Sequence, residues 1–506
     1  MKFRRIFPYI IPCLICFFTK ASMGAKTVEF IADTVTTLRN PLQGWVMYLG
    51  KNWDENFWEE QSYDSMPVNG GEDTVKVSDY ATCAYIRTSW VSLEPEEGKY
   101  IWNEPDSRLM KLLESVRKRG MKLAFRIVID GRDQGQNTPQ YVFDAGANNY
   151  CDPNNPGKNL SPFPDDRIFR EKYANFFKAF AERFDNSDEV EFIDAYSLGK
   201  WGESHSMIYE DNANKQDVFK WMIDLASSCF HEVPLVIHYH RMLGDPDDDG
   251  WGEVSPDTEK MLNYAVGKGF ILRHDAFGMN GYYQDWEKAT AAQWNMVRPI
   301  IMEGGWITGA HHRYWRDPSG KYREGHPEDV RLGEFQAAEE AKVNMMDLRT
   351  NDEVRSWFHD SFDLVKEFIK RGGYRIYPAK ATFPENVVNT AGVEILTEWK
   401  NIGWGYCPDN IPSWNGKYKV AIVLLDNDAN PINITIEENS DLSKWKQDTV
   451  YPYCTSVNLS EVPAGNYILG TAIVDTTKKN VPSLALAADD AEYIDGWLKL
   501  GNIEIN

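Results

Sequence analysis

Two glutamates, each at or just beyond the end of a strand-like run, are the residues of this sequence best suited to chemistry. Glu303 follows the apolar residues 300–302 and is followed by two glycines and a tryptophan. Glu203 comes shortly after the run 192–197 and is preceded by tryptophan and glycine. One carboxyl group that donates a proton, with one carboxylate that attacks carbon or activates water, can hydrolyse a glycosidic bond. A lone glutamate of this kind is usually a solvated loop charge, but a matched pair favours a shared catalytic function.

A closed barrel of parallel strands would bring the two glutamates together, because the C-terminal ends of its strands meet at one mouth. Between residues 40 and 374, strand-length apolar runs alternate with segments whose apolar residues recur at helical spacing. Eight such runs favour a (β/α)8 TIM barrel of class α/β over an open doubly wound sheet, and no GxGxxG follows the first run. The predicted strands lie near residues 40–48, 82–87, 123–129, 192–197, 235–239, 270–274, 300–303 and 343–348, and the predicted helices near 105–120, 167–184, 215–229, 257–267, 288–297, 330–341 and 352–370.

The sequence changes character after residue 374. Strand-forming runs at 420–425, 467–474 and 498–505 are separated by turn signals, and no helix-length amphipathic run appears. This pattern predicts a C-terminal β-sandwich domain over residues 375–506, attached to a catalytic barrel over residues 25–374.

The first 24 residues have the pattern of a signal peptide. Three basic residues precede the apolar stretch 6–18, which is too short to span a bilayer, and small residues at 22–24 offer a cleavage site. We therefore expect a mature protein that is secreted or periplasmic. No later stretch is long and apolar enough to predict a transmembrane segment.

Composition limits the expected partners. The formal net charge is −22, and an acidic surface repels phosphate backbones, so nucleic acid is not an expected partner. The chain has 18 Trp, 25 Tyr and 24 Phe; most should pack in the core, but flat rings also suit the faces of sugars. The cysteines beyond residue 24 show no CxxC pattern, and pairing of Cys407 with Cys454 is left open. The oligomeric state is unknown.

The segment 85–102 resembles the clan A glycoside hydrolases, which include β-galactosidase-like TIM barrels. It reads YIRTSW at 85–90 and LEPEEGKYIW at 93–102. In that clan an arginine on the second strand supports the nucleophile, the acid/base ends the fourth strand, and the nucleophile ends the seventh. The resemblance implies a retaining cleavage of a poly- or oligosaccharide without a cofactor, with Glu203 as acid/base, Glu303 as nucleophile and Arg87 as its positioning partner.

A second resemblance and two departures bear on the substrate. The segments 397–405, 463–467 and 484–487 resemble the sandwich of a group of uncharacterised secreted bacterial barrel proteins, whose activity does not carry over. Gly202 stands where clan A enzymes usually have the asparagine that holds the sugar 2-hydroxyl. The predicted eighth strand also lacks the tryptophan often found at its end. The sugar, the linkage and the choice between exo and endo action are therefore not predicted.

Further polar and aromatic residues at the predicted mouth are candidates for holding a sugar. For Asp130, after the third strand, capping a loop is an equal alternative. The candidate substrate-binding residues are His205, His238, His240, Tyr282, Trp306, Trp315 and Asp130.

Two other functions remain open. His238 and His240 point the same way from one strand, and with His274 and Asp275 they would form the site of a metal-dependent hydrolase. The favoured interpretation assigns no metal. A protein that binds glycans without cleaving them would keep the same two domains. The acidic stretch 245–250 resembles a calcium loop but lacks the final glutamate, so it is expected to be a solvated turn.

Overall fold

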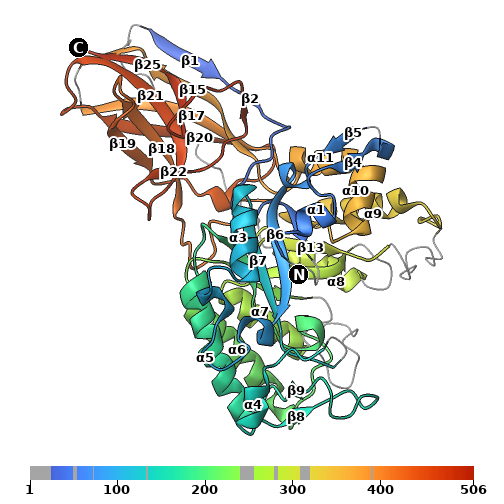
Figure 1. The fold of residues 1–506 in the computed structure, drawn as a ribbon. Coiled ribbons are helices and arrows are strands. Elements are labelled where there is room, and N and C mark those ends of the chain that lie inside the picture. Colours follow the sequence, from blue (N-terminus) through green and yellow to red (C-terminus); the bar gives the residue numbers. More distant parts are fainter. Residues whose placement is uncertain are drawn as a thin grey trace, which may run out of the picture.

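The computed structural model describes residues 24–49, 54–71, 73–132, 135–239, 256–277, 283–307, 320–388 and 391–506. In this part of the chain, eight parallel strands form a closed barrel, and two further sheets form a second unit (Figure 1). The predicted (β/α)8 barrel with a C-terminal β-sandwich is confirmed. The barrel strands are β3 (Gly44–Tyr48), β6 (Ala81–Ser89), β7 (Lys122–Val128), β10 (Val190–Asp194), β11 (Leu235–His238), β12 (Ile271–Phe277), β13 (Ile300–Gly304) and β14 (Met345–Asp347).

Helices cover the outside of the barrel, and α5 (Arg167–Phe184) shows why they form where they do. The Asp166 side chain accepts a hydrogen bond from the amide of Phe169 and caps the first turn. Aromatic residues at helical spacing are then buried along one stripe. The helix predicted over 352–370 is two helices that meet at Ser361. The other helices are α1 (Phe57–Glu60), α2 (Trp90–Leu93), α3 (Arg108–Lys118), α4 (Gln140–Asp144), α6 (Lys215–Cys229), α7 (Pro256–Gly267), α8 (Asp285–Trp294), α9 (Pro327–Glu340), α10 (Asp352–Asp360) and α11 (Phe362–Arg371).

The barrel interior is layered. Successive side chains on a strand point to opposite faces, so every second residue faces inward. The lower interior layers are apolar and include Cys83, Ala124, Phe192, Val236 and Ile301. The next inward position on four of these strands carries a polar or charged side chain. On β6 the next inward position is Tyr85, and the one after it is Arg87. An apolar core therefore lies beneath a charged layer at the C-terminal mouth.

The second unit is a sandwich of two sheets, with strand orders β1-β15-β17-β20 and β16-β25-β21-β18-β19. The N-terminal strand β1 (Ala25–Glu29) pairs with β15 (Ile376–Pro384), and β2 (Ile31–Ala32) pairs with β23 (Ala488–Asp489). Residues 25–32 thus pair with the sandwich, whereas the sequence pattern assigned them to the barrel. No helix lies between β2 and β3, so these residues lack the helical crossover that joins one parallel barrel strand to the next. The remaining strands are β4 (Met66–Val68), β5 (Asp73–Val75), β8 (Asn149–Tyr150), β9 (Ser161–Pro162), β16 (Asn386–Val387), β17 (Ala391–Asn401), β18 (Tyr418–Leu425), β19 (Pro431–Glu437), β20 (Val450–Asn458), β21 (Gly465–Asp475), β22 (Val481–Leu484), β24 (Tyr493–Ile494) and β25 (Trp497–Ile505).

The sandwich is attached to the barrel at the end opposite the mouth. Trp404 Nε1 donates to the carbonyl of Val343, just before β14, at 2.8 Å. Trp414 Nε1 donates to the carbonyl of Glu232, before β11, at 3.1 Å. Both carbonyls precede barrel strands, so these contacts lie at the bottom of the barrel, and the sandwich extends away from it (Figure 1).

Several predictions concern other parts of the chain. Residues 1–23 of the predicted signal peptide and the acidic stretch 245–250 lie outside the described residues. No helix in the described ranges combines the length and apolar character needed to cross a bilayer. Cys407 is a buried thiol without a disulfide bond, so the pairing with Cys454 that the sequence left open is not formed.

Candidate active site

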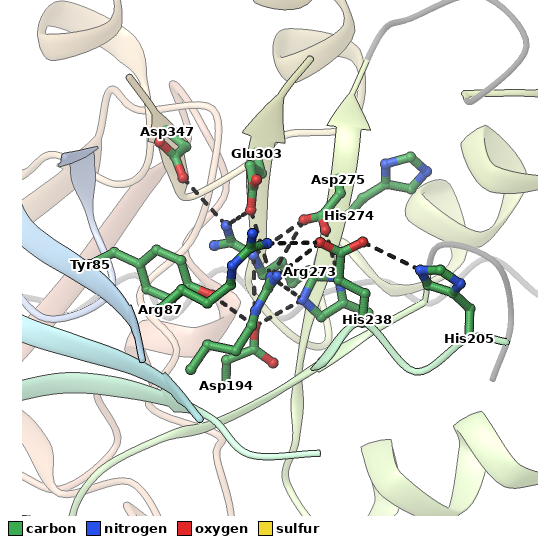
Figure 2. A network of polar contacts seen from close by, with 12 residues as sticks. Tyr85, Arg87, Asp194, His205, His238, Arg273, His274, Asp275, Glu303 and Asp347 are labelled. Carbon is green, nitrogen blue, oxygen red and sulfur yellow. Dashed lines mark hydrogen bonds and ion pairs between the residues drawn. The ribbon is translucent and has the colours of Figure 1, made fainter. Parts of the chain in front are cut away.

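A layer of charged side chains faces inward at the C-terminal end of the barrel (Figure 2). Each lies two positions after an inward-facing residue, as Glu303 follows Ile301 and Arg126 follows Ala124. All of these side chains except Arg87 are buried. The layer consists of Arg87 of β6, Arg126 of β7, Asp194 of β10, His238 of β11, Arg273 and Asp275 of β12, Glu303 of β13 and Asp347 of β14.

Glu203 lies on the loop after β10, which follows an unusual backbone path. Ser197, Trp201, Ser204 and Ser206 all have positive φ, a conformation that residues other than glycine seldom adopt. Such strain persists only where surrounding structure enforces it, and it is concentrated at functional sites. The loop therefore has the character of a segment held in one conformation to place a side chain.

The Glu203 carboxylate is buried among opposite charges. Its Oε1 accepts hydrogen bonds from Arg126 Nη1 at 3.1 Å and from Arg87 Nη1 at 3.4 Å, and its Oε2 lies 3.5 Å from His205 Nε2. Burial and the neighbouring Asp275 act to raise the pKa of Glu203, but the hydrogen bond from His205 and the charge of Arg126 outweigh them. The pKa of Glu203 is therefore lowered, and the site holds this carboxylate ionised.

Glu303 is surrounded by arginines. Arg273 Nη2 and Arg349 Nη1 both contact its carboxylate, and Arg126 Nη2 lies 3.6 Å from its Oε2. The Arg349 guanidinium also lies over the Trp306 ring, 4.2 Å from the ring centroid. Opposite charges at these distances favour the charged form of a carboxylate, which is the form that a nucleophile needs.

Arg126 connects the two glutamates. Its Nη1 contacts Glu203 and its Nη2 faces Glu303, so the two carboxylates flank one guanidinium group. Its Nε donates to Asp194 Oδ2 at 2.8 Å. Burial acts to raise the pKa of Asp194, but the charges of His238 and Arg126 lower it to about 2. The ionised Asp194 therefore holds Arg126 as a buried positive charge between the glutamates.

Asp347 and Arg349, at and just beyond the end of β14, form a second buried group beside Glu303. Asp347 Oδ1 accepts from the backbone amide of Arg349 at 2.5 Å, and its Oδ2 accepts from Arg273 Nη2 at 3.3 Å. Burial raises the pKa of Asp347 to about 6, against the opposing charge of Arg273. Burial also lowers the pKa of Arg349 to about 10. Glu303 therefore shares Arg273 with a carboxyl group that titrates in the weakly acidic range.

The structure gives neighbours for Arg87 and Gly202, the two positions compared above with the resembled family. Arg87, predicted as the positioning partner of Glu303, donates to Glu203, and Arg126, Arg273 and Arg349 contact Glu303. Gly202 has a φ of 74°, and a Cβ atom there would lie 3.3 Å from Arg126 Cδ. An asparagine at this position would be strained and would press on Arg126.

The other predicted binding residues are placed in part. His205 is buried beside Glu203, and Trp306 lies two residues beyond the end of β13 against Arg349. Both are therefore at the mouth. His240, Tyr282 and Trp315 lie outside the described residues.

Asp130 is engaged with its own loop. Its Oδ1 accepts from Ser161 Oγ at 2.9 Å and its Oδ2 from Tyr150 OH at 3.3 Å, and Arg132 forms an ion pair with it. The carboxylate thus joins three segments of the long loop between β7 and α5. These contacts match the loop-capping alternative.

His238 and His274 lie on opposite faces of neighbouring strands, which contradicts the metal site proposed for them together with His240. His238 faces inward, with Nε2 2.8 Å from Asp194 Oδ2. His274 faces outward, with Nε2 2.7 Å from Glu287 Oε1 of α8. Side chains on opposite faces cannot coordinate one ion. Among the described residues, no group of three or more His, Cys, Asp or Glu has the arrangement of a metal site.

Several residues of the charged layer were not singled out from the sequence, although a signal for them exists. Each is a charged residue that directly follows at least two apolar residues of its strand, the same signal that marked Glu303. Arg349 lies beyond its strand and has no such signal. The four residues with this signal are Arg126, Asp194, Arg273 and Asp347.

Comparisons with known proteins add little about function. No family model matches the chain, and no curated protein matches it in sequence. Native xylanase 10B from Thermotoga maritima is 9% identical with a TM-score of 0.35, over 60% of this chain and 82% of that one. Xylanase B from Clostridium stercorarium F9 is 11% identical with a TM-score of 0.33, over 60% and 85%. Endo-glycoceramidase II from Rhodococcus sp., as its lactosyl-enzyme intermediate, is 13% identical with a TM-score of 0.36, over 82% and 97%. These values are too low to carry an argument about activity, which has to come from the site.

Proposed function

We propose that this protein is a glycoside hydrolase in which Glu303 is the nucleophile and Glu203 the acid/base. The observation that carries the proposal is that the two glutamates, from β13 and from the loop after β10, flank the guanidinium group of Arg126 at the barrel mouth. Catalytic residues of barrel enzymes lie at this end. The proposed substrate is a poly- or oligosaccharide, with β-galactosides among the first to test.

The proposed reaction is a double displacement with retention of configuration. Glu303 attacks the anomeric carbon while Glu203 gives a proton to the departing oxygen, and a glycosyl-enzyme ester forms. Glu203 then takes a proton from water, which attacks the same carbon and releases Glu303. Arg273 and Arg349 contact the Glu303 carboxylate and orient it for the first step. The anomer first formed, observed by proton NMR, distinguishes this course from inversion.

The lowered pKa of Glu203 has a consequence for this role. A general acid has to be protonated, and Arg126 and His205 favour the ionised form. The value of kcat/KM reports the ionisation of the free enzyme, so it should decline as pH rises through the pKa of Glu203. We therefore expect an acidic pH optimum.

Substitution of the two glutamates tests the proposal. Glu303→Ala should abolish turnover, and Glu203→Gln should lower kcat by about 10²–10⁴-fold on a glycan with a poor leaving group. Glu210→Gln, an exposed glutamate on the same loop region, should behave as wild type. Azide added to Glu303→Gly should restore turnover and yield a glycosyl azide, because a small anion can replace a missing nucleophile.

Two results would overturn the enzymatic proposal. One is that folded Glu303→Ala and Glu203→Gln proteins both keep their activity. The other is binding without turnover by the wild-type protein across a broad panel of aryl glycosides and polysaccharides, which would indicate a glycan-binding protein.

We also propose that residues 1–24 direct export and are removed, so that the protein acts outside the cytoplasm, where polysaccharides are met. Its charge of −22 makes nucleic acid an unfavourable partner there or elsewhere. A mature N-terminus at Ala25 in the periplasm or medium supports export. An intact N-terminus on cytoplasmic protein would count against it.

A further inference from the structure

Three charged side chains without exposed surface lie behind the end of β13, on the outer face of the barrel. They are Arg331 and Glu334 of α9 and Glu353 of α10. Arg331 Nη1 donates to Glu334 Oε2 at 2.8 Å, and its Nη2 donates to Glu353 Oε2 at 2.6 Å. We call these residues the α9–α10 triad. Apolar residues of similar volume often stabilise a fold as well as buried ion pairs do, so stability alone does not account for the triad.

The second oxygen of each glutamate binds the backbone that follows Glu303. Glu334 Oε1 accepts from the amide of Gly305 at 3.0 Å, and Glu353 Oε1 accepts from the amide of Ile307 at 3.0 Å. Each carboxylate therefore joins Arg331 to one backbone amide, and the two amides flank Trp306. Buried amides without acceptors are costly, so the triad dictates the path of the chain from 304 to 307.

Trp306 connects the 304–307 backbone to the candidate nucleophile through Arg349. Its ring supports the guanidinium of Arg349 at 4.2 Å, and Arg349 contacts the Glu303 carboxylate. Gly304, next to Glu303, also depends on the triad, because a Cβ atom there would lie 2.8 Å from Glu334 Oε1. The triad is therefore connected to Glu303 both through Trp306 and Arg349 and through Gly304.

We propose that Arg331, Glu334 and Glu353 are positioning residues for Glu303, acting through the 304–307 backbone and the Trp306–Arg349 pair. Their effect on the backbone is independent of what the protein catalyses. Their effect on turnover rests on the proposed function, in which Glu303 must be aligned with an anomeric carbon. Groups that orient catalytic side chains typically change activity by about 10–100-fold when altered.

The variants Glu334→Gln and Glu353→Gln test the proposal. A glutamine can accept on one side only, so it has to give up its bond either to Arg331 or to the loop amide. Amide hydrogen exchange in the 300–307 segment should become about 10-fold faster or more. In an active enzyme kcat should fall about 10–100-fold with KM nearly unchanged, because alignment rather than binding is lost.

Glu437→Gln is the matched control. Glu437 is also buried and also accepts with both oxygens, from the amide of Asn439 at 3.2 Å and from Thr455 Oγ1 at 3.0 Å, but it lies in the sandwich. It should leave both exchange at 300–307 and kcat at wild-type values. If the single variants unfold, the triple variant Arg331→Met, Glu334→Leu, Glu353→Leu removes the charges together and should fold, yet still show fast exchange and low kcat.

The outcomes separate this inference from the proposed function. If the glutamine variants exchange faster at 300–307 but the wild-type protein cleaves no glycoside, the positioning role of the triad is supported and the proposed hydrolase activity is refuted. Unchanged exchange in both glutamine variants would refute the triad, as would fast exchange with wild-type kcat. Loss of folding in all three variants would assign the triad to stability alone and would also refute it.

Discussion

At the scale of single residues, the ionisation of Glu203 depends on neighbours that the chain brings from separate segments. Burial and Asp275 act to raise its pKa, and the hydrogen bond from His205 with the charge of Arg126 lowers it. His205 is itself oriented by Ser206, whose Oγ lies 2.8 Å from His205 Nδ1. His205 is therefore the residue through which the pH range of the proposed acid can be shifted without removing the acid.

His205→Ala is expected to extend activity to higher pH. Removing a group that favours the ionised carboxylate raises the pKa of Glu203, so the proton that a general acid needs is kept to higher pH. The alkaline limb of the kcat/KM profile should then move upward relative to wild type. His231→Ala, an exposed histidine, should leave the limb in place. A limb that stays or moves to lower pH in His205→Ala would show that His205 does not tune Glu203.

At the scale of elements, glycines at the end of β13 and in the loop after β10 allow neighbouring segments to pack closely at the mouth of the barrel. Gly304 ends β13 with Glu334 of α9 against it. Gly199 lies in the loop after β10, where a Cβ atom would lie 2.6 Å from the carbonyl oxygen of His205. In each case a backbone without a side chain lets a second segment lie against the chain that carries a candidate catalytic glutamate.

Gly304→Ala should therefore impair both stability and turnover. The added methyl group would displace the Glu334 carboxylate from the amide of Gly305, and overpacking of this kind typically costs about 1–3 kcal/mol. We expect a lower melting temperature and a kcat reduced by about 10-fold or more. Gly267→Ala at the end of α7, where no atom lies within 4 Å of the added Cβ, is the control. Wild-type kcat in Gly304→Ala would contradict this account.

At the scale of the whole molecule, the sandwich supports the barrel from the end remote from the mouth. The loop between β17 and β18 makes this junction, and it contains a buried carboxyl group, Asp409. Its Oδ1 accepts from the amide of Tyr418 at 3.0 Å, and its Oδ2 has no hydrogen-bond partner among the described residues. Burial raises the pKa of Asp409 to about 7, against the effect of the Tyr418 amide.

This group should make the stability of the junction depend on pH. A carboxyl group whose pKa is raised on folding binds more protons in the native state than in the unfolded chain. Its contribution to stability is therefore present below about pH 4 and is lost as pH rises towards about 7. Asp409→Asn, which keeps the acceptor for Tyr418, should be more stable than wild type at pH 8. The difference should shrink at pH 4.5 in urea unfolding, and an equal difference at both pH values would contradict this origin.

The extent to which the sequence was informative differs between elements. The helices predicted near 167–184 and 215–229 coincide with α5 and α6, because a clear apolar stripe is a local signal. The break at Ser361 was missed, since the apolar spacing continues across it. Residues 25–32 were assigned to the barrel because a strand's partner, here more than 300 residues away, leaves no mark in the strand itself.

The sequence by itself determined the barrel and the sandwich, and it placed Glu303 in a strand and Glu203 in the segment after one, because hydrophobic period and strand order are properties of the chain. The tertiary structure decided which charges meet. It paired Arg87 with Glu203, set three arginines around Glu303, and turned His274 away from His238. These contacts join strands far apart in sequence. Ion pairing depends on distance and burial, so it became apparent only when the barrel was closed.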